Sequence, residues 1–314
     1  MGFSVVRYRR GKNGSWGILH YDKISPLAGS YDSLGQFLTQ GLSKARMVKD
    51  KVARRAIAYS KNKVLSPVTG PCQIICQGKN YRKHLEETGS EKKDFNLFFT
   101  KSHTAIASAY GNVIRPPDVK LLDYELELGL VIGAPITRSE TVREKNLHKY
   151  VAGLVMANDI SARDIQLPQG QWFKGKSFRT FCPIGPHLFI LEREDYPKLA
   201  KLNLLLTVNG EKRQEATTAQ MMYKPHETLS ELSQVVDLMP GDIVLTGTPG
   251  GVAMQLDKKT SKKMQSGKLT TERFITEQLK GGRYLQDSDI IRSYIYDDER
   301  TIDLGKQELQ VIAG

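Results

Sequence analysis

The chain has 314 residues, of which 39% are hydrophobic and 25% are charged, a balance typical of globular proteins. This length fits one large domain or two smaller ones, and no apolar run approaches the roughly 20 residues that span a bilayer. The N-terminus has no apolar core of signal-peptide length, and the three cysteines show no zinc-ligand pattern. We therefore expect a protein of the reducing cytoplasm that does not enter a membrane.

The net charge of +12 is unevenly distributed along the chain. Residues 1–70 hold 13 basic and 3 acidic residues, and residues 255–283 hold 8 and 3. Such a basic surface could attract nucleic acid or an acidic partner. Because it shows no helix-turn-helix, zinc or RNP-like pattern, we do not expect nucleic-acid binding. The simpler interpretation is a solvated basic surface that also attracts anionic substrates.

In chain order, residues 1–70 are predicted to form a small N-terminal domain. Residues 1–20 alternate loosely around a Gly-Lys-Asn-Gly turn, which predicts a β-hairpin, and residues 34–59 should hold one or two helices. The Pro/Gly-rich segment 64–71 then marks a domain boundary. Residues 71–314 would form the larger domain, which carries the chemistry.

The larger domain is predicted to be rich in strands with few long helices. Asn209-Gly210 is a strong hairpin signal, and the basic insert 255–283 resembles an exposed loop or short helix. With no internal repeat, GxGxxG motif or P-loop, the pattern indicates an α+β fold. The expected elements are a strand at 73–76, a helix through Tyr81, His84 and Glu87, strands at 121–133, 151–158 and 202–208, a helix at 228–236, and strands at 242–245, 290–296 and 308–312.

Alternation along residues 121–133 predicts a β-strand with an apolar face and an acidic face. The acidic face carries Glu125 and Glu127, which repel each other unless water, a cation or a metal ion lies between them. Taken alone, this pattern fits an antiparallel strand with a wet acidic face. Asp159, which alone could be a helix N-cap, would add a third carboxylate at the end of strand 151–158. Three hard oxygen ligands favour Mg²⁺, with Mn²⁺ or Ca²⁺ as alternatives, over zinc.

Other polar residues could assist such a site, although each also has an ordinary interpretation. His84 and Glu87 lie three residues apart on a predicted helix, where they could hydrogen-bond so that the histidine acts as a general base. The alternative is a surface His–Glu pair. Lys176 could be a solvent lysine or could stabilise an oxyanion. The loop around Thr248 could be a simple turn or could hold a carboxylate.

Five segments, in this order and spacing, resemble the fumarylacetoacetate hydrolase superfamily. The match covers about residues 71–254 well and the last strands more loosely. The resemblance implies a mixed β-roll or sandwich of packed sheets, usually dimeric, preceded by a small N-terminal domain. The five segments are CQGKNYRKHLEE, LDYELELGLVIG, MANDISARDIQ, GQWFKGKSFRTFCPIGP and GDIVLTGTPGGVA.

The resemblance also implies roles for individual residues. The family's metal carboxylates match Glu125, Glu127 and Asp159, and the His–Glu dyad of its acylpyruvase-like branch matches His84 and Glu87. The remaining matches are Lys176, as an oxyanion group, and the substrate-binding residues Arg163, Gln166 and Thr248.

The implied reaction is metal-dependent hydrolysis of a carbon–carbon bond in a 1,3-diketone or acylpyruvate-type 2-oxo acid. In it, the His84–Glu87 pair would activate water. The alternative is a decarboxylase, tautomerase, isomerase or hydratase that uses the same metal site. A non-catalytic protein that binds anions or nucleic acid is a further alternative, which the intact metal ligands and dyad disfavour. We expect a small anionic keto-acid substrate and a homodimer.

Three features depart from the family's pattern. Arg179 stands where similar chains carry an acid, and Ser288 replaces a common glycine. The insert 255–283 is longer and more basic than usual. Because none of them touches a proposed metal ligand, they should affect which substrate is used and leave activity as such intact.

Overall fold

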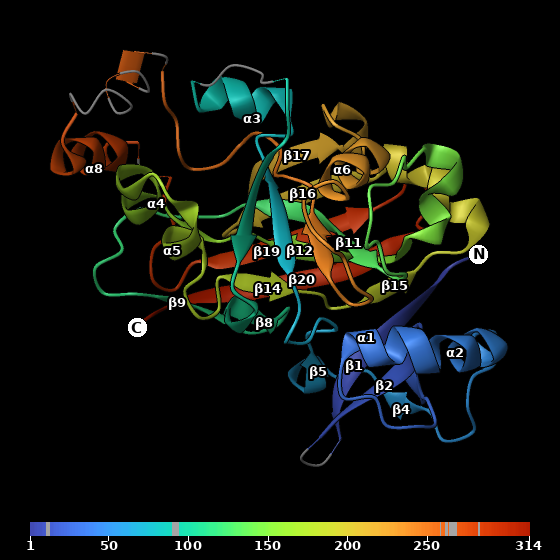
Figure 1. The fold of residues 1–314 in the computed structure, drawn as a ribbon. Coiled ribbons are helices and arrows are strands. Elements are labelled where there is room, and N and C mark those ends of the chain that lie inside the picture. Colours follow the sequence, from blue (N-terminus) through green and yellow to red (C-terminus); the bar gives the residue numbers. More distant parts are fainter. Residues whose placement is uncertain (11–12, 90–93, 258, 261–262, 264–268, 282) are drawn as a thin grey trace.

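The computed structural model describes residues 1–10, 13–89, 94–257, 259–260, 263, 269–281 and 283–314. This part of the chain folds into one large sheet, a smaller sheet and a two-stranded ladder, with short helices around them (Figure 1). The arrangement confirms the predicted α+β fold class. No helix within these ranges is long and apolar enough to cross a membrane.

The large sheet runs through the whole molecule. Its main path is β4-β3-β2-β1-β15-β12-β11-β18-β6-β7, and β5, β8 and β14 pair beside that path. Its strands are β1 (Phe3–Arg10), β2 (Asn13–His20), β3 (Lys23–Pro26), β4 (Ile57–Ala58), β5 (Val64–Leu65), β6 (Ile74–Gly78), β7 (Leu97–Lys101), β8 (Ile106–Ser108), β11 (Leu126–Ile132), β12 (Val151–Asn158), β14 (Cys182–Ile184), β15 (Leu188–Ile190) and β18 (Ile243–Leu245).

The smaller sheet has the order β17-β16-β19-β20-β9. Its hairpin β16–β17 turns at Asn209 and Gly210, whose φ angles of 53° and 84° suit a two-residue turn, so the predicted hairpin is confirmed. A separate ladder pairs β10 with β13. The strands of these two units are β9 (Asn112–Arg115), β16 (Asn203–Val208), β17 (Glu211–Thr217), β19 (Ile290–Tyr296) and β20 (Asp303–Ala313), and β10 (Leu122–Asp123) and β13 (Ser161–Ala162).

The helices are short and lie around the sheets. The helix predicted at 228–236 begins earlier, because Pro225 opens it at a position where a missing N–H costs nothing. In the basic insert 255–283 a short helix is confirmed, while residues 258, 261–262, 264–268 and 282 lie outside the described part. The α-helices are α1 (Leu34–Gln36), α2 (Leu42–Val48), α3 (Arg82–Glu87), α4 (Arg163–Gln169), α5 (Trp172–Lys176), α6 (Pro225–Leu232) and α8 (Thr271–Leu279), and the other helical turns are η1 (Phe37–Gly41), η2 (Lys61–Lys63), η3 (His103–Ala105), η4 (Glu144–Lys149), η5 (Arg193–Lys201) and η6 (Thr218–Gln220).

The N-terminal lobe, here residues 1–65, confirms the predicted hairpin, since β1 pairs with β2; turn residues 11–12 lie outside the described part. The helix expected within 34–59 ends at Val48. Beyond it, the Ala53 amide donates to Ser25 Oγ and β4 pairs with β3, so this segment is held as an edge strand. Because β1 also pairs with β15, one sheet and one apolar core cross the proposed boundary near residue 70. The two-domain division therefore stays a prediction.

The strand predicted at 121–133 is interrupted, and its acidic face is not wet. It splits into β10 and β11 around Glu125, whose amide N–H donates to Asn158 Oδ1 instead of to a backbone carbonyl of a neighbouring strand. All seven residues of β11 are buried, because β12 and β18 pair with its two edges and apolar clusters cover both faces. The expectation of a solvated face is therefore wrong. The carboxylates of this segment lie inside the protein.

The pairing of the central strands brings distant loops to one end of the sheet. β6 runs parallel to β18, and β18 runs antiparallel to β11. The segment after β6 and the loop after β18 therefore meet the start of β11 and the end of β12. Since β12 leads into Asp159, this end of the sheet collects polar groups from four separate stretches of the chain.

Candidate active site

A cavity of about 480 Å³ opens at this end of the sheet, where Figure 1 shows α3, α4, α5 and α8 on one side of the molecule. Its volume lies in the range of small-molecule sites. The apolar part of its wall includes Phe99 and Trp172, whose rings meet edge to face at 5.0 Å. The polar part consists of Gln77, Lys79, His84, Thr88, Glu125, Glu127, Arg163, Gln166, Gln169, Lys176, Thr248 and Thr271.

The three predicted metal carboxylates do come together. Glu125 precedes β11, Glu127 lies within it, and Asp159 follows β12. One oxygen from each can be chosen so that all three lie within 4.8 Å of one another, and all three residues are buried. Asp159 is fixed by the chain itself, because its amide donates to the Glu125 carbonyl at 2.8 Å.

Two buried lysines balance part of this negative charge. Lys176 Nζ donates to Glu125 Oε2 at 2.7 Å, to Asp159 Oδ2 and to Ser161 Oγ. Burial lowers the pKa of Lys176, but Asp159 and Glu125 outweigh that effect and raise it above its usual value. Lys101 Nζ, on β7, binds the other oxygen of Asp159. Each ammonium group therefore binds a different carboxylate oxygen of Asp159.

Glu127 differs from its neighbours because no described cation contacts it. Its carboxylate accepts one hydrogen bond, from the Gly247 amide at 2.9 Å. Burial, together with Asp159 and Glu125, raises the pKa of Glu127 well above its usual value. A buried carboxylate without a counter-charge, beside two others, fits a divalent cation, and an all-carboxylate donor set suits Mg²⁺ or a similar hard ion. The metal identity stays a prediction.

Arg163, at the start of α4, holds the other acidic group of the site. Its Nε donates to Asp123 Oδ2 at 2.9 Å, its Nη2 binds Glu125, and its Nη1 donates to Gln166 Oε1 at 2.9 Å. Burial raises the pKa of Glu125, yet Arg163 and Lys176 together hold it below the usual value. Arg163 and Gln166 therefore lie at the cavity as predicted. The guanidinium, however, is already engaged by two carboxylates.

The predicted His84–Glu87 hydrogen bond is not formed. Both residues lie on α3, but Glu87 Oε2 accepts from the Gly251 amide at 2.7 Å, which turns the carboxylate toward the loop after β18. Nδ1 of the buried His84 has no hydrogen-bond partner. Burial lowers the pKa of His84 to about 4, so the imidazole is neutral at physiological pH. His84 faces the cavity, whereas Glu87 is not part of its wall.

Thr248 lines the cavity, as predicted, and its hydroxyl also anchors the loop that follows β18. Thr248 Oγ1 donates to the Leu126 carbonyl at 3.1 Å and accepts from Gln214 Nε2 at 2.8 Å. The buried Gln214 also accepts from the Leu126 amide at 2.9 Å. One amide side chain of β17 therefore fixes this loop against β11.

Sequence reasoning missed Lys101, Asp123 and Gln214. Asp123 accepts from the Ala253 amide at 2.8 Å and from the Met254 amide at 3.2 Å, so it ties Arg163 to the loop after β18. A lysine at the end of the apolar run LFFTK was a signal for a buried cation. The partners that Asp123 and Gln214 have at the site lie between 34 and 131 residues away in sequence, and no local pattern points to them.

Two of the three departures from the family pattern lie away from the cavity. Arg179 is exposed and does not line it. Ser288 has a φ of 77°, a conformation that glycine adopts without strain, which explains why glycine is common there in similar chains. The insert does reach the site, because Leu269 and Thr271 form part of the cavity wall.

Comparisons with known proteins agree on one family. The model for the fumarylacetoacetate hydrolase C-terminal domain matches residues 73–312. The bovine protein "Oxaloacetate tautomerase FAHD2A, mitochondrial" (Bos taurus) is 38% identical over 223 residues, which cover 70% of this chain and 69% of that protein. The cytoplasmic location expected from the sequence therefore stays a prediction.

Two solved structures cover nearly the whole chain. The fumarylacetoacetate hydrolase of psychrophilic Exiguobacterium antarcticum superposes with a TM-score of 0.76 at 28% identity, over 99% of this chain and 100% of that one. A probable 2-hydroxyhepta-2,4-diene-1,7-dioate isomerase of Mycobacterium abscessus gives a TM-score of 0.74 at 29% identity, over 100% and 99%. With the family model covering most of the chain, this protein belongs to the fumarylacetoacetate hydrolase family.

Proposed function

We propose that this chain interconverts the keto and enol forms of a small 2-oxo diacid of the oxaloacetate kind. The observation that carries the proposal is the state of His84, a neutral imidazole at the cavity that Glu87 does not orient. A base that must activate water is normally fixed by a second group, whereas a proton shuttle needs only to reach the substrate. The name of the bovine relative supports the same reaction.

Tautomerisation requires a group that moves one proton between the carbon beside the keto group and the keto oxygen. The acceptor nitrogen of a neutral imidazole can take a proton from carbon and return it to oxygen, so His84 needs only one nitrogen at the cavity. Its depressed pKa keeps it neutral, and therefore able to accept, across the physiological range. Its unpartnered Nδ1 has no competing hydrogen bond.

Neighbouring groups would stabilise the charge that develops on the substrate oxygen. Lys176 stays protonated because its raised pKa lies above any working pH, and it lines the cavity. Gln166 uses its oxygen to accept from Arg163, and its amide nitrogen donates to no described residue. That NH₂ group is the natural donor to a substrate oxygen.

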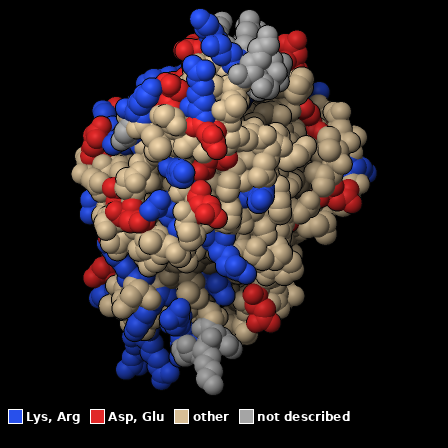
Figure 2. Space-filling view, turned by 90° about the vertical axis from the view of Figure 1, so that its left-hand side faces the viewer, with Lys and Arg blue, Asp and Glu red and all other residues tan. Residues whose placement is uncertain are grey.

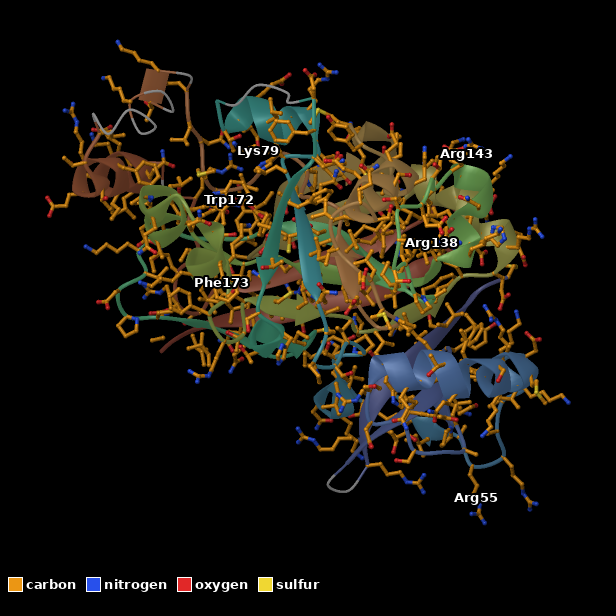
Figure 3. All side chains as sticks on the ribbon, viewed as in Figure 1. Arg55, Lys79, Arg138, Arg143, Trp172 and Phe173 are labelled. Atoms are coloured by element: carbon orange, nitrogen blue, oxygen red, sulfur yellow. The ribbon has the colours of Figure 1, made fainter. Side chains whose placement is uncertain are left out.

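The charges of the cavity fit a dianionic substrate and a cation. A divalent metal held by Glu125, Glu127 and Asp159 would supply electrophilic polarisation of a 2-oxo acid. Lys79, also on the wall, adds positive charge where a second carboxylate can lie, and its field reaches His84 and lowers the pKa of that residue further. Figure 3 shows Lys79 beneath α3, on the side of the molecule that holds the cavity.

The hydrolase predicted from the sequence is the second candidate. The fold shared with the hydrolase of E. antarcticum favours it, and so does the retained Glu87. Hydrolysis would need Glu87 to release Gly251 and turn toward His84. The tautomerase, which the sequence left as an alternative, needs no such rearrangement.

A paired assay separates the two candidates. The purified protein would be given enol-oxaloacetate, whose loss is followed by ultraviolet absorbance, and acetylpyruvate, whose cleavage is followed by product release. Both assays are run with Mg²⁺ and with a chelator. We expect fast, metal-dependent ketonisation that His84→Ala abolishes and Glu87→Gln preserves. Efficient acetylpyruvate cleavage that both variants lose would replace the tautomerase with the hydrolase.

A further inference from the structure

A second concave site lies in the N-terminal lobe, outside the cavity described above. Its volume is about 760 Å³, within the range of small-molecule sites. It lies where the end of β1 meets the segment after β3 and the stretch around β4. Its described wall consists of Tyr8, Arg9, Arg10, Pro26, Leu27, Ala28, Ala53, Arg55, Ile57 and Lys63.

All charged residues of this second site's described lining are basic. It has four cations, Arg9, Arg10, Arg55 and Lys63, and no acidic residue among its described lining. None of the four forms an ion pair with a described carboxylate. Other cations of the same lobe do find partners, since Arg46 and Lys61 bind glutamates of the main body. Figure 2 shows Lys and Arg side chains gathered at the lower end of the molecule, where Figure 1 places the lobe.

A buried donor lies among these cations. Tyr8 is 1% exposed, and its Oη has no hydrogen-bond partner. The hydroxyl is enclosed by protein, so it lies behind the wall of the hollow and does not open into it. Burial raises the pKa of Tyr8, and the nearby Arg10 opposes that rise. The Arg10 side chain therefore lies beside Tyr8, at the wall of the hollow.

We propose that this pocket binds a small molecule through a diphosphate group. Several unpaired cations around one hollow match an anion with more than one charge, and the guanidinium fork suits phosphate oxygens. Tyr8 would help to position the Arg10 guanidinium beside that group. The apolar residues of the wall, among them Pro26, Leu27 and Ile57, can cover an uncharged organic portion.

The shape and lining of the pocket favour a small molecule over a nucleic-acid strand. Proteins that bind single strands use exposed aromatic rings on which successive bases stack. Here the aromatic residue of the described wall, Tyr8, is buried. The site is a bounded hollow, and the backbone of a duplex needs an extended basic surface.

The experiment is calorimetric titration of the full-length protein with inorganic pyrophosphate and with ADP. We expect one site per chain, weakened about tenfold by Arg10→Gln and about tenfold by Arg55→Gln, because each removes a charge-assisted contact. Tyr8→Phe should weaken binding by a smaller factor. Arg143→Gln is the matched control, since Figure 3 shows Arg143 near the top of the view and Arg55 near the bottom.

Each outcome decides the proposal or its ligand source. Tighter binding of ADP identifies a diphosphate ester as the ligand, and tighter binding of pyrophosphate identifies the free anion. The proposal is overturned if neither binds, if Arg143→Gln weakens binding as much as Arg55→Gln, or if a short oligonucleotide binds more tightly than both probes. Oxaloacetate ketonisation should be unchanged in all of these variants, so the test does not depend on the proposed function.

Discussion

The active-site cavity and the N-terminal lobe are both rich in charged side chains, but these are buried and paired at the cavity and solvated in the lobe. At and behind the cavity wall, Lys101, Lys176 and Arg163 are buried, and each is bound to one or more carboxylates. In the lobe, Arg9 and Arg55 are exposed and form no ion pair with a described residue. Water solvates the second pair at little cost, whereas a buried charge must find a partner inside the protein. Net charge alone therefore says little about where chemistry takes place.

The strongest test of this comparison removes the acid that two buried lysines share. Asp159→Ala leaves Lys101 and Lys176 with one fewer buried counter-charge each, so we expect a loss of about 3–5 kcal/mol in the free energy of unfolding. Urea denaturation measures it. Glu127→Gln is the matched variant, because its amide oxygen can still accept from Gly247. It should lose Mg²⁺ binding, measured by calorimetry, yet unfold at or above the wild-type urea concentration without metal. Equal destabilisation by both changes would contradict the assigned pairing.

The second test uses pH. His84 has a pKa near 6.5 in the unfolded chain, and burial lowers it to about 4 in the folded protein. Its contribution to stability is therefore complete above pH 6.5 and is lost as the pH falls from 6.5 toward 4, because the unfolded state takes up the proton first. Between pH 7 and pH 5, wild-type protein should lose about 2 kcal/mol more than His84→Gln. Parallel losses in the two proteins would show that His84 is not buried as described.

The third test asks whether Lys79, at the cavity wall, binds the second carboxylate of the substrate. Lys79→Met should raise KM for oxaloacetate about tenfold, equivalent to about 1.4 kcal/mol, and leave kcat little changed. A 2-oxo monoacid such as phenylpyruvate should be unaffected, because it has no second carboxylate. Lys83→Met, on the exposed side of α3, is the control. A fall in kcat for both substrates would instead place Lys79 in the proton transfer.

The smallest effect is expected in the lobe. Arg55→Gln removes an exposed cation without an ion-pair partner, so the free energy of unfolding should change by less than about 0.5 kcal/mol. Thermal unfolding at low ionic strength would detect a larger change in stability. Destabilisation comparable to that of Asp159→Ala would mean that the lobe charges are structural, and the contrast between the two regions would fail.

The sequence predicted most of the central fold because local patterns were strong there. Alternation located β11, apolar runs located β12 and β16, and Asn209-Gly210 located the β16–β17 hairpin. What it could not show was burial on both faces of β11, since alternating glutamates are the usual mark of a half-exposed strand. That burial arises from neighbours β12 and β18, which are distant in sequence.

The candidate site was predictable where residues match family segments, and less so where geometry decides. The three carboxylates lie together as expected. The His84–Glu87 bond failed because helical spacing places two residues on one face without saying which neighbour each will bind. Gly251, 164 residues away, binds Glu87 instead. Short strands such as β7, which carries Lys101, gave no periodic signal long enough to detect.

The pairing of β1 with β15 has a consequence for self-association. β15 also pairs with β12, so β1 covers what would otherwise be an open edge of the central sheet. A chain that began after the lobe would expose the backbone donors and acceptors of Leu188–Ile190 beside apolar residues. Such edges recruit strands from other molecules, which leads to aggregation and domain exchange. The lobe therefore covers an edge strand through which the sheets of two copies of the protein could otherwise pair.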